Sequence, residues 1–131
     1  MSHPVRPLSP HLQVYRWQIQ MTTSILHRAT GVILAVGSLL IAAALVSLAI
    51  GPDAWACTSA LAGSWPGLLV LFGWTWALSF HFLNGIRHLL QDAGLGYGIA
   101  QFVRNGWLSV IGSFVLTALV WGVLIARGVL A

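Results

Sequence analysis

Three long apolar segments, separated by short polar or glycine-rich stretches, dominate the pattern of this 131-residue chain. Residues 31–50 contain no ionisable side chain, and a helix of that length spans roughly 30 Å, the hydrocarbon thickness of a membrane. Further apolar segments cover about 66–90 and 107–125. The pattern predicts an all-α integral membrane bundle of three transmembrane helices, over about 22–50, 66–91 and 105–127.

Proline and glycine mark the boundaries of these segments. Gly51-Pro52-Asp53 is expected to end the first helix, and residues 94–98 are expected to form a turn after the second. No strand precedes the glycines of 94–98, so they resemble a phosphate-binding fingerprint only superficially. Residues 1–20 are polar and contain three prolines, which predicts an extended N-terminal arm before a transmembrane domain over 21–131.

The composition agrees with a membrane location. Hydrophobic residues make up 58% of the chain and charged residues 6%, against about 25% charged in soluble domains. The net charge of +4 comes from scattered arginines without the basic stripe that tracks a phosphate backbone, which argues against nucleic-acid binding. The single cysteine, Cys57, excludes an internal disulfide and a cysteine-ligated metal site. Residues 1–30 contain no apolar segment followed by a cleavage site, so the sequence predicts no removable signal peptide.

The arginines predict the topology. Three spans place the N-terminus and the second connection on one side of the membrane. Five arginines fall on that side and only Arg127 on the other; the five are Arg6, Arg16, Arg28, Arg87 and Arg104. The positive-inside rule then predicts a multi-pass protein of the inner (cytoplasmic) membrane with a cytoplasmic N-terminus.

The second span contains the first candidate site. His81, Gly85, His88 and Asp92 share one helix face at i, i+4, i+7 and i+11, and ionisable groups inside a span are functional candidates. Gly85 leaves room for a flat ligand, so His81 suits an axial ligand to haem. A hydrogen-bonded core histidine fits the spacing equally well, and His88 with Asp92 would also suit a surface pair.

The first span contains a second polar cluster at the same membrane depth. Ser24 and Arg28 lie at i and i+4, on one helix face, with His27 between them. A cofactor ligated at His81, roughly 9 Å deeper than Arg87, could direct its acidic edge toward His27 and Arg28. Arg28 and Arg87 could instead be topology anchors whose charges reach the interface.

Three motifs together resemble the cytochrome b membrane-anchor subunit of succinate dehydrogenase (succinate:quinone oxidoreductase, respiratory complex II). They are the arm Arg6–Leu12, S-x-x-H-R-x-T-G at Ser24–Gly31, and H-x-x-x-G-x-R-H-L-x-x-D at His81–Asp92. The resemblance covers all three spans in order, and the combination at this spacing is highly specific.

The resemblance implies one haem b shared with a second anchor subunit, with His81 as this chain's axial ligand and the partner supplying the other histidine. It implies that Ser24 and Arg28 bind quinone, here ubiquinone, and that His27 and Arg28 lie near the haem propionates. Gly85, His88 and Asp92 are possible supporting residues. The implied partners also include an iron–sulfur subunit, a flavoprotein subunit that oxidises succinate, and membrane lipid.

Two other functions are consistent with the residues. An anchor subunit of a fumarate reductase would have the same architecture and run the reverse reaction. A non-haem membrane assembly or transport protein would use the histidines structurally. If haem is bound, His27 and His88 lie on the correct side to ligate the iron in place of His81.

Overall fold

The structure is a computed structural model, and it describes residues 11 and 14–128. These residues form four α-helices, and no strand occurs in the described part. The helices are α1 (Ile19–Ile50), α2 (Pro52–Gly63), α3 (Trp65–Asp92) and α4 (Ile99–Ala126). By length and composition α1, α3 and α4 are able to cross a membrane, which confirms the predicted all-α membrane bundle of three spans.

Local sequence explains where the helices begin and end. Gly51, with φ of 147°, separates α1 from α2, and Pro52 occupies the first position of α2. The Ser64 hydroxyl accepts a hydrogen bond from the Gly67 amide (3.3 Å) and caps α3. Gly94 and Gly96, with φ of 82° and 79°, form the predicted turn between α3 and α4.

Two features of the connections were not anticipated. The segment after α1 folds as the helix α2, because Pro52 suits a first helical turn and the following residues contain no helix breaker before Gly63. The third span begins at Ile99 rather than near 105, since the polar residues that open α4 continue the helix beyond its apolar part.

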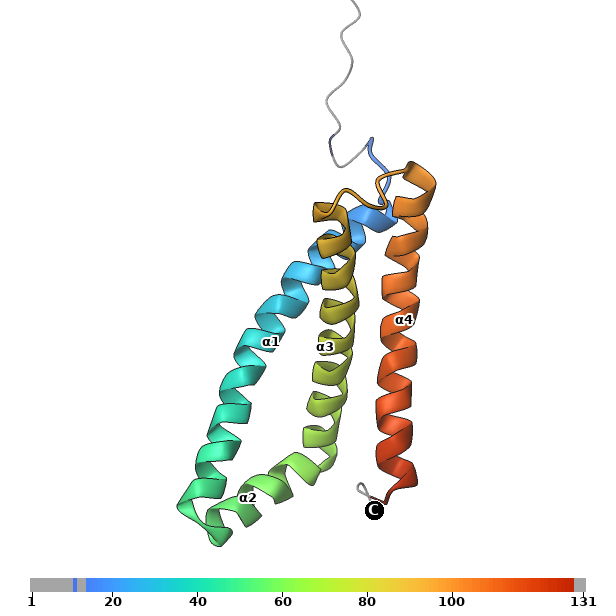
Figure 1. Cartoon of the computed structure of the whole chain (residues 1–131). Coiled ribbons are helices and arrows are strands. Elements are labelled where there is room, and N and C mark those ends of the chain that lie inside the picture. Colours follow the sequence, from blue (N-terminus) through green and yellow to red (C-terminus); the bar gives the residue numbers. More distant parts are fainter. Residues whose placement is uncertain (1–10, 12–13, 129–131) are drawn as a thin grey trace, which may run out of the picture.

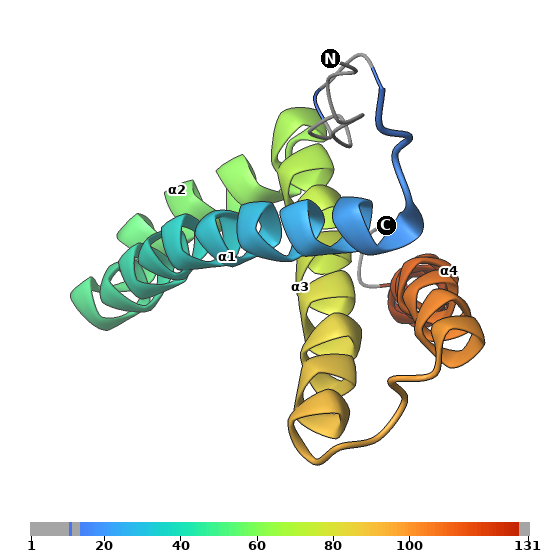
Figure 2. The same cartoon turned by 90° about the horizontal axis from the view of Figure 1, so that it is seen from above.

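The helices are antiparallel and unequally packed. α3 and α4 lie side by side along their length, whereas α1 crosses α3 at one end and diverges toward the other, where α2 joins them (Figures 1 and 2). The start of α1, the end of α3 and the start of α4 therefore meet at one end of the bundle. This end is called the N-terminal end below.

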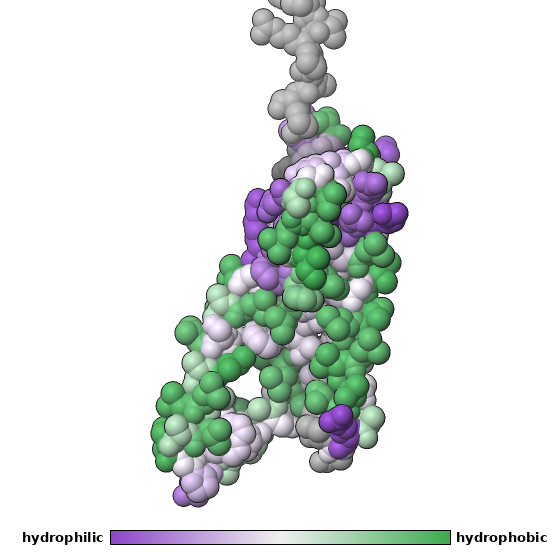
Figure 3. All heavy atoms as spheres, in the orientation of Figure 1, coloured by the Kyte–Doolittle hydropathy of each residue, from purple (hydrophilic) through white to green (hydrophobic). Residues whose placement is uncertain are grey.

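Small and polar side chains, rather than large apolar ones, lie between the helices. Among the described residues the buried hydrophobic side chains are Ala77 and Phe80, and nine polar or charged residues are also buried. Thr117 of α4, for example, donates to the Ser79 hydroxyl of α3 (3.3 Å). Most large apolar residues face outward (Figure 3), as expected where lipid rather than water surrounds the helices.

The charged residues agree with the predicted sidedness. Four arginines lie toward the N-terminal end of the bundle, namely Arg16, Arg28, Arg87 and Arg104. Arg127 follows α4 at the opposite end. Arg6 and most of the predicted arm lie outside the described residues. The division into an arm over 1–20 and a domain over 21–131, and the cytoplasmic side of the N-terminus, stay predictions.

Candidate functional site

Three histidines from two helices meet near the N-terminal end of the bundle. The imidazole rings of His27 in α1 and His81 in α3 are stacked, with centroids 4.0 Å apart and planes 6° from parallel. The ring of His88, two turns further along α3, lies 5.0 Å from that of His27 at an angle of 50°. The structure thus brings together the polar clusters that the sequence placed at one depth.

Contacts with α1 favour one tautomer of the His81 ring. Its Nδ1 atom lies 3.2 Å from the His27 carbonyl oxygen and 3.3 Å from Thr30 Oγ1. Thr30 Oγ1 itself donates to the Leu26 carbonyl (2.7 Å), so its lone pairs are free to accept. Because a carbonyl oxygen only accepts, the proton resides on Nδ1, and Nε2 keeps a lone pair for a metal or a donor.

Glycine on α1 provides the space for the His81 ring. A Cβ added to Gly31 would lie 3.2 Å from His81 Cε1, closer than side chains normally approach. A Cβ added to Gly85 would meet one neighbour, His27 Cε1 at 4.0 Å, so the surroundings of Gly85 are open within the described chain. The space beside Gly85 is therefore open in the described chain, and Gly31, which belongs to the first motif but was given no role there, lets α1 approach His81.

The α1 residues predicted to bind quinone or to contact the haem propionates are at least partly exposed. Ser24 and His27 are half-buried and Arg28 is exposed. His27 Nδ1 is buried and has no hydrogen-bond partner among the described residues. A buried ring nitrogen without a partner is costly, so its partner is expected to come from outside this part of the chain.

His88 and Asp92 do not form the surface pair that their spacing allows. His88 is half-buried and directed toward His27, whereas Asp92 is exposed as the last residue of α3. No ion pair joins them in the structure, and the described residues contain no group of three or more histidine, cysteine or acidic side chains able to hold a metal ion.

Arg87 is buried, contrary to its interpretation as a topology anchor that reaches the interface. Only 6% of the residue is exposed, and Nη1 donates to Thr23 Oγ1 (3.4 Å) and Asn84 Oδ1 (3.1 Å). The guanidinium carbon lies 4.5 Å from the centre of the Phe102 ring, a cation–π distance. Arg87 thus connects α3 to α1 and α4. Asn84, three residues earlier on the same helix face, is the residue from which the sequence could have indicated this role.

Comparisons with known proteins agree with this arrangement. The family model described as "Succinate dehydrogenase/Fumarate reductase transmembrane subunit" matches residues 2–120. The chain is 46% identical over 114 residues to the succinate dehydrogenase cytochrome b556 subunit of Paracoccus denitrificans, covering 87% of this chain and 88% of that protein. It is 39% identical to the corresponding subunit of Rickettsia prowazekii, covering 88% and 90%.

A mitochondrial relative is also similar. The succinate dehydrogenase cytochrome b560 subunit of Sus scrofa is 38% identical over 111 residues, covering 81% of this chain and 64% of the pig protein. These matches confirm the resemblance drawn from the three motifs and the anchor role that it implies. The chain belongs to the family of succinate dehydrogenase/fumarate reductase transmembrane subunits, with the cytochrome b subunits of succinate dehydrogenase as its relatives.

Proposed function

We propose that the chain binds one haem b through His81 and contributes Ser24 and Arg28 to the site at which ubiquinone is reduced. The observation that carries the haem part is the hydrogen bond between His81 Nδ1 and the His27 carbonyl oxygen. Histidines that ligate metals usually donate their other ring nitrogen to a carbonyl or carboxylate, which fixes the ring and leaves Nε2 for the metal.

The surrounding residues fit a haem in three further respects. Gly85 leaves open space on the histidine face of α3, as a large flat group requires. His27 Nδ1 is a buried donor or acceptor without a partner in the described chain. His81 supplies one ligand, which is what a haem shared between two subunits would take from each.

Each residue then has a distinct role. Bound haem b would supply one-electron transfer at an iron whose two histidine ligands leave no position open for oxygen. His27 and Arg28 would hold the propionates of a bound haem, because a ring N–H and a permanent cation favour carboxylates at the membrane interface. Thr30 and the His27 carbonyl keep the His81 ring in its orientation.

The same end of α1 also provides the proposed quinone-binding residues, Ser24 and Arg28. Ser24 donates its hydroxyl proton toward a quinone oxygen, and Arg28 stabilises the negative charge that develops there during reduction. Both residues lie in the first third of α1, where a lipid-soluble substrate meets protons from water. Arg28 is exposed in this chain alone, so partner subunits have room to complete the pocket.

Membership of a succinate dehydrogenase complex implies an iron–sulfur and a flavoprotein partner. A second anchor subunit supplies the other axial histidine and covers the polar face formed by α1 and α3. The complex lies in the inner (cytoplasmic) membrane with the N-terminus of this chain in the cytoplasm, as the arginine distribution predicts.

One experiment tests haem binding and assembly together. The chain is purified from native membranes through an affinity tag, its co-purifying subunits are identified, and a reduced-minus-oxidised absorption spectrum is recorded. We expect haem b bands at one haem per complex together with three further subunits. Bands that are absent from an assembled complex would reject haem binding and favour a structural role for the histidines.

The second candidate function is that of an anchor subunit in a fumarate reductase, which runs the reverse reaction, because the matching family includes fumarate reductase subunits as well. The same preparation distinguishes the two functions. Faster turnover of succinate with a ubiquinone analogue than of fumarate with a reduced low-potential quinone indicates a succinate dehydrogenase, and the reverse ratio indicates a fumarate reductase.

A further inference from the structure

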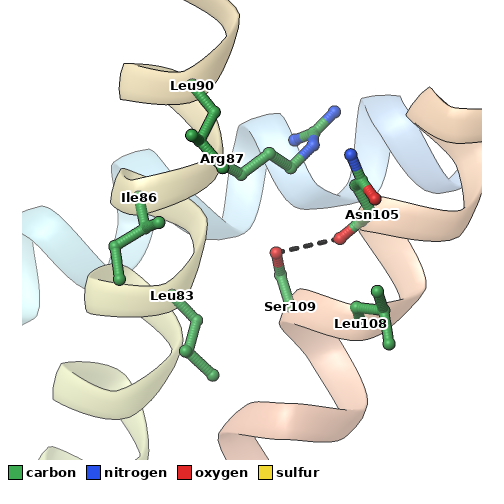
Figure 4. A pocket seen from close by; sticks show the side chains of 7 residues that line it. All are labelled: Leu83, Ile86, Arg87, Leu90, Asn105, Leu108 and Ser109. Atoms are coloured by element: carbon green, nitrogen blue, oxygen red, sulfur yellow. Dashed lines mark hydrogen bonds between the residues drawn. The ribbon is translucent and has the colours of Figure 1, made fainter. Parts of the chain in front are cut away.

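Two hollows lie in line along one side of the α3–α4 pair, and together they are called the α3–α4 groove below. Its first part is a hollow of about 200 Å³, seen in Figure 4 with α1 behind it and lined by Leu83, Ile86, Arg87, Leu90, Asn105, Leu108 and Ser109. Its second part is a hollow of about 430 Å³ lined by Thr75, Leu78, Ser79, Phe82, Leu116 and Val120. The lining positions of α3 recur every three or four residues from Thr75 to Leu90, so both hollows lie along one face.

The floor and the walls of this α3–α4 groove differ in character. Ser79, Arg87 and Ser109 at the floor are each at most 6% exposed. The walls are large apolar side chains that are 40–59% exposed, namely Leu78, Phe82, Ile86, Leu90, Leu108 and Val120. Figure 4 shows Arg87 and Asn105 directed toward each other across the upper part of the groove. The groove thus has a charged, polar end at Arg87 and Asn105, and its walls along the rest are mainly apolar.

The polar end carries a positive charge that the described chain does not neutralise. No carboxylate forms an ion pair with Arg87 among the described residues, and Arg87 Nε is buried without a hydrogen-bond partner. A buried cation without a counterion is destabilising in a membrane protein. Charge complementarity therefore favours an anionic occupant at this end.

The position and length of the groove match one leaflet of a bilayer. Arg87 is five residues from the end of α3, about 7.5 Å along the axis, which places it near the headgroup level. The sixteen residues of α3 from Thr75 to Leu90 cover about 22 Å along the axis, more than the roughly 15 Å of one hydrocarbon leaflet. The two hollows together are therefore long enough to receive one acyl chain.

The groove does not compete with the histidine face. Ser79 and His81 are two residues apart, so their side chains point about 160° apart around the axis of α3. A second anchor subunit that supplies an axial histidine would contact the His81 face. The groove, on the other side of α3, is not needed for that contact.

From these observations we propose that the α3–α4 groove binds one anionic phospholipid. Its phosphate group contacts the Arg87 guanidinium and the Asn105 amide, and one acyl chain occupies the apolar part down to Val120. Arginine suits phosphate because its planar fork of N–H donors matches the phosphate oxygens. A neutral quinone headgroup would leave the charge of Arg87 uncompensated, so a phospholipid is favoured over a second quinone.

The test uses the intact complex purified in detergent and titrated with dioleoylphosphatidylglycerol or dioleoylphosphatidylcholine, with bound lipid counted by native mass spectrometry. We expect one tightly held phosphatidylglycerol and at least tenfold weaker phosphatidylcholine binding. Arg87→Gln should weaken phosphatidylglycerol binding at least tenfold. The matched control Arg104→Gln removes an exposed arginine of α4 and should leave binding unchanged.

Two bulky substitutions test the apolar part without removing Arg87. Leu108→Trp and Val120→Trp enlarge exposed wall residues and should each displace the lipid, whereas Leu119→Trp, exposed but outside the lining, should not. If the Arg87→Gln complex fails to assemble, these variants decide. The proposal would be overturned by undiminished phosphatidylglycerol binding in both Leu108→Trp and Val120→Trp. Equal binding of the two lipids by the unaltered complex, or bound quinone in place of lipid, would also overturn it.

Discussion

The imidazole of His81 in α3 lies flat against that of His27 in α1, and the Nδ1 atom of His81 is 3.2 Å from the carbonyl oxygen of His27. Helix α1 therefore holds the His81 ring from its face and from its edge. Since α1 also carries Ser24 and Arg28, one helix orients the proposed haem ligand and presents the proposed quinone-binding residues. A change in how α1 packs on α3 should then affect both functions.

The ligand assignment is tested by replacing each histidine of α3 separately. We expect His81→Ala to abolish or severely alter the haem b spectrum of the purified complex, because it removes the ring whose Nε2 is left free. His88→Ala, the matched control on the same helix, should keep the haem bands. Loss of haem in His88→Ala with retention in His81→Ala would reverse the assignment.

Quinone reduction and haem retention should respond differently to a change at Arg28. Arg28→Ala is expected to lower succinate:quinone reductase activity about 100-fold, because it removes a charge aimed at the quinone oxygens. Haem content should fall far less, since His81 still ligates the iron. Activity and the haem spectrum are measured on the same preparation, with Arg104→Ala as the control; equal loss of both signals would argue against separate roles.

Gly31 should control the position of the His81 ring. In Gly31→Ala the new Cβ would lie 3.2 Å from His81 Cε1, so the ring must shift by a few tenths of an ångström. We expect a changed haem spectrum or midpoint potential with haem still bound, and haem loss in the bulkier Gly31→Val. Gly73→Ala in α3, where no described atom lies within 4 Å, should leave both measurements unchanged.

The sequence predicted the helices well because each depends on its own residues. Apolar length determines the three spans, and Gly51, Gly94 and Gly96 separate helices through backbone conformations that glycine adopts easily. The helix α2 was missed because a twelve-residue connection of mixed polarity has no periodic signal that distinguishes it from a loop.

The site was predicted less completely because it depends on how the helices rotate against one another. The sequence placed the two polar clusters at one depth, but not the stacking of His27 on His81. Arg87 looked equally suited to the interface, and only its contacts with Thr23, Asn84 and Phe102 from three helices reveal that it is buried. Sequence spacing defines which residues share a helix face, but not which neighbour that face meets.

The contact of Gly37 in α1 with Trp74 in α3 gives the last prediction. Gly37 of α1 is buried, and a Cβ added to it would overlap the indole of Trp74 in α3. Gly37→Ala should therefore separate the two helices or displace the indole, at a cost of about 1–3 kcal/mol in the free energy of unfolding. Thermal denaturation of the purified complex, followed through the haem absorbance, would detect the loss as a lower midpoint temperature.

A second substitution distinguishes this overlap from other effects of alanine. Trp74→Phe removes the indole nitrogen and the larger ring, so Gly37→Ala should cost less in a Trp74→Phe background than in the unaltered chain. Gly122→Ala in α4 is the control, since no described atom lies within 4 Å of its added Cβ. Because α1 also carries Ser24 and Arg28, Gly37→Ala should lower quinone reductase activity together with stability. A midpoint temperature that does not change in Gly37→Ala would mean that α1 and α3 are not held together at this contact.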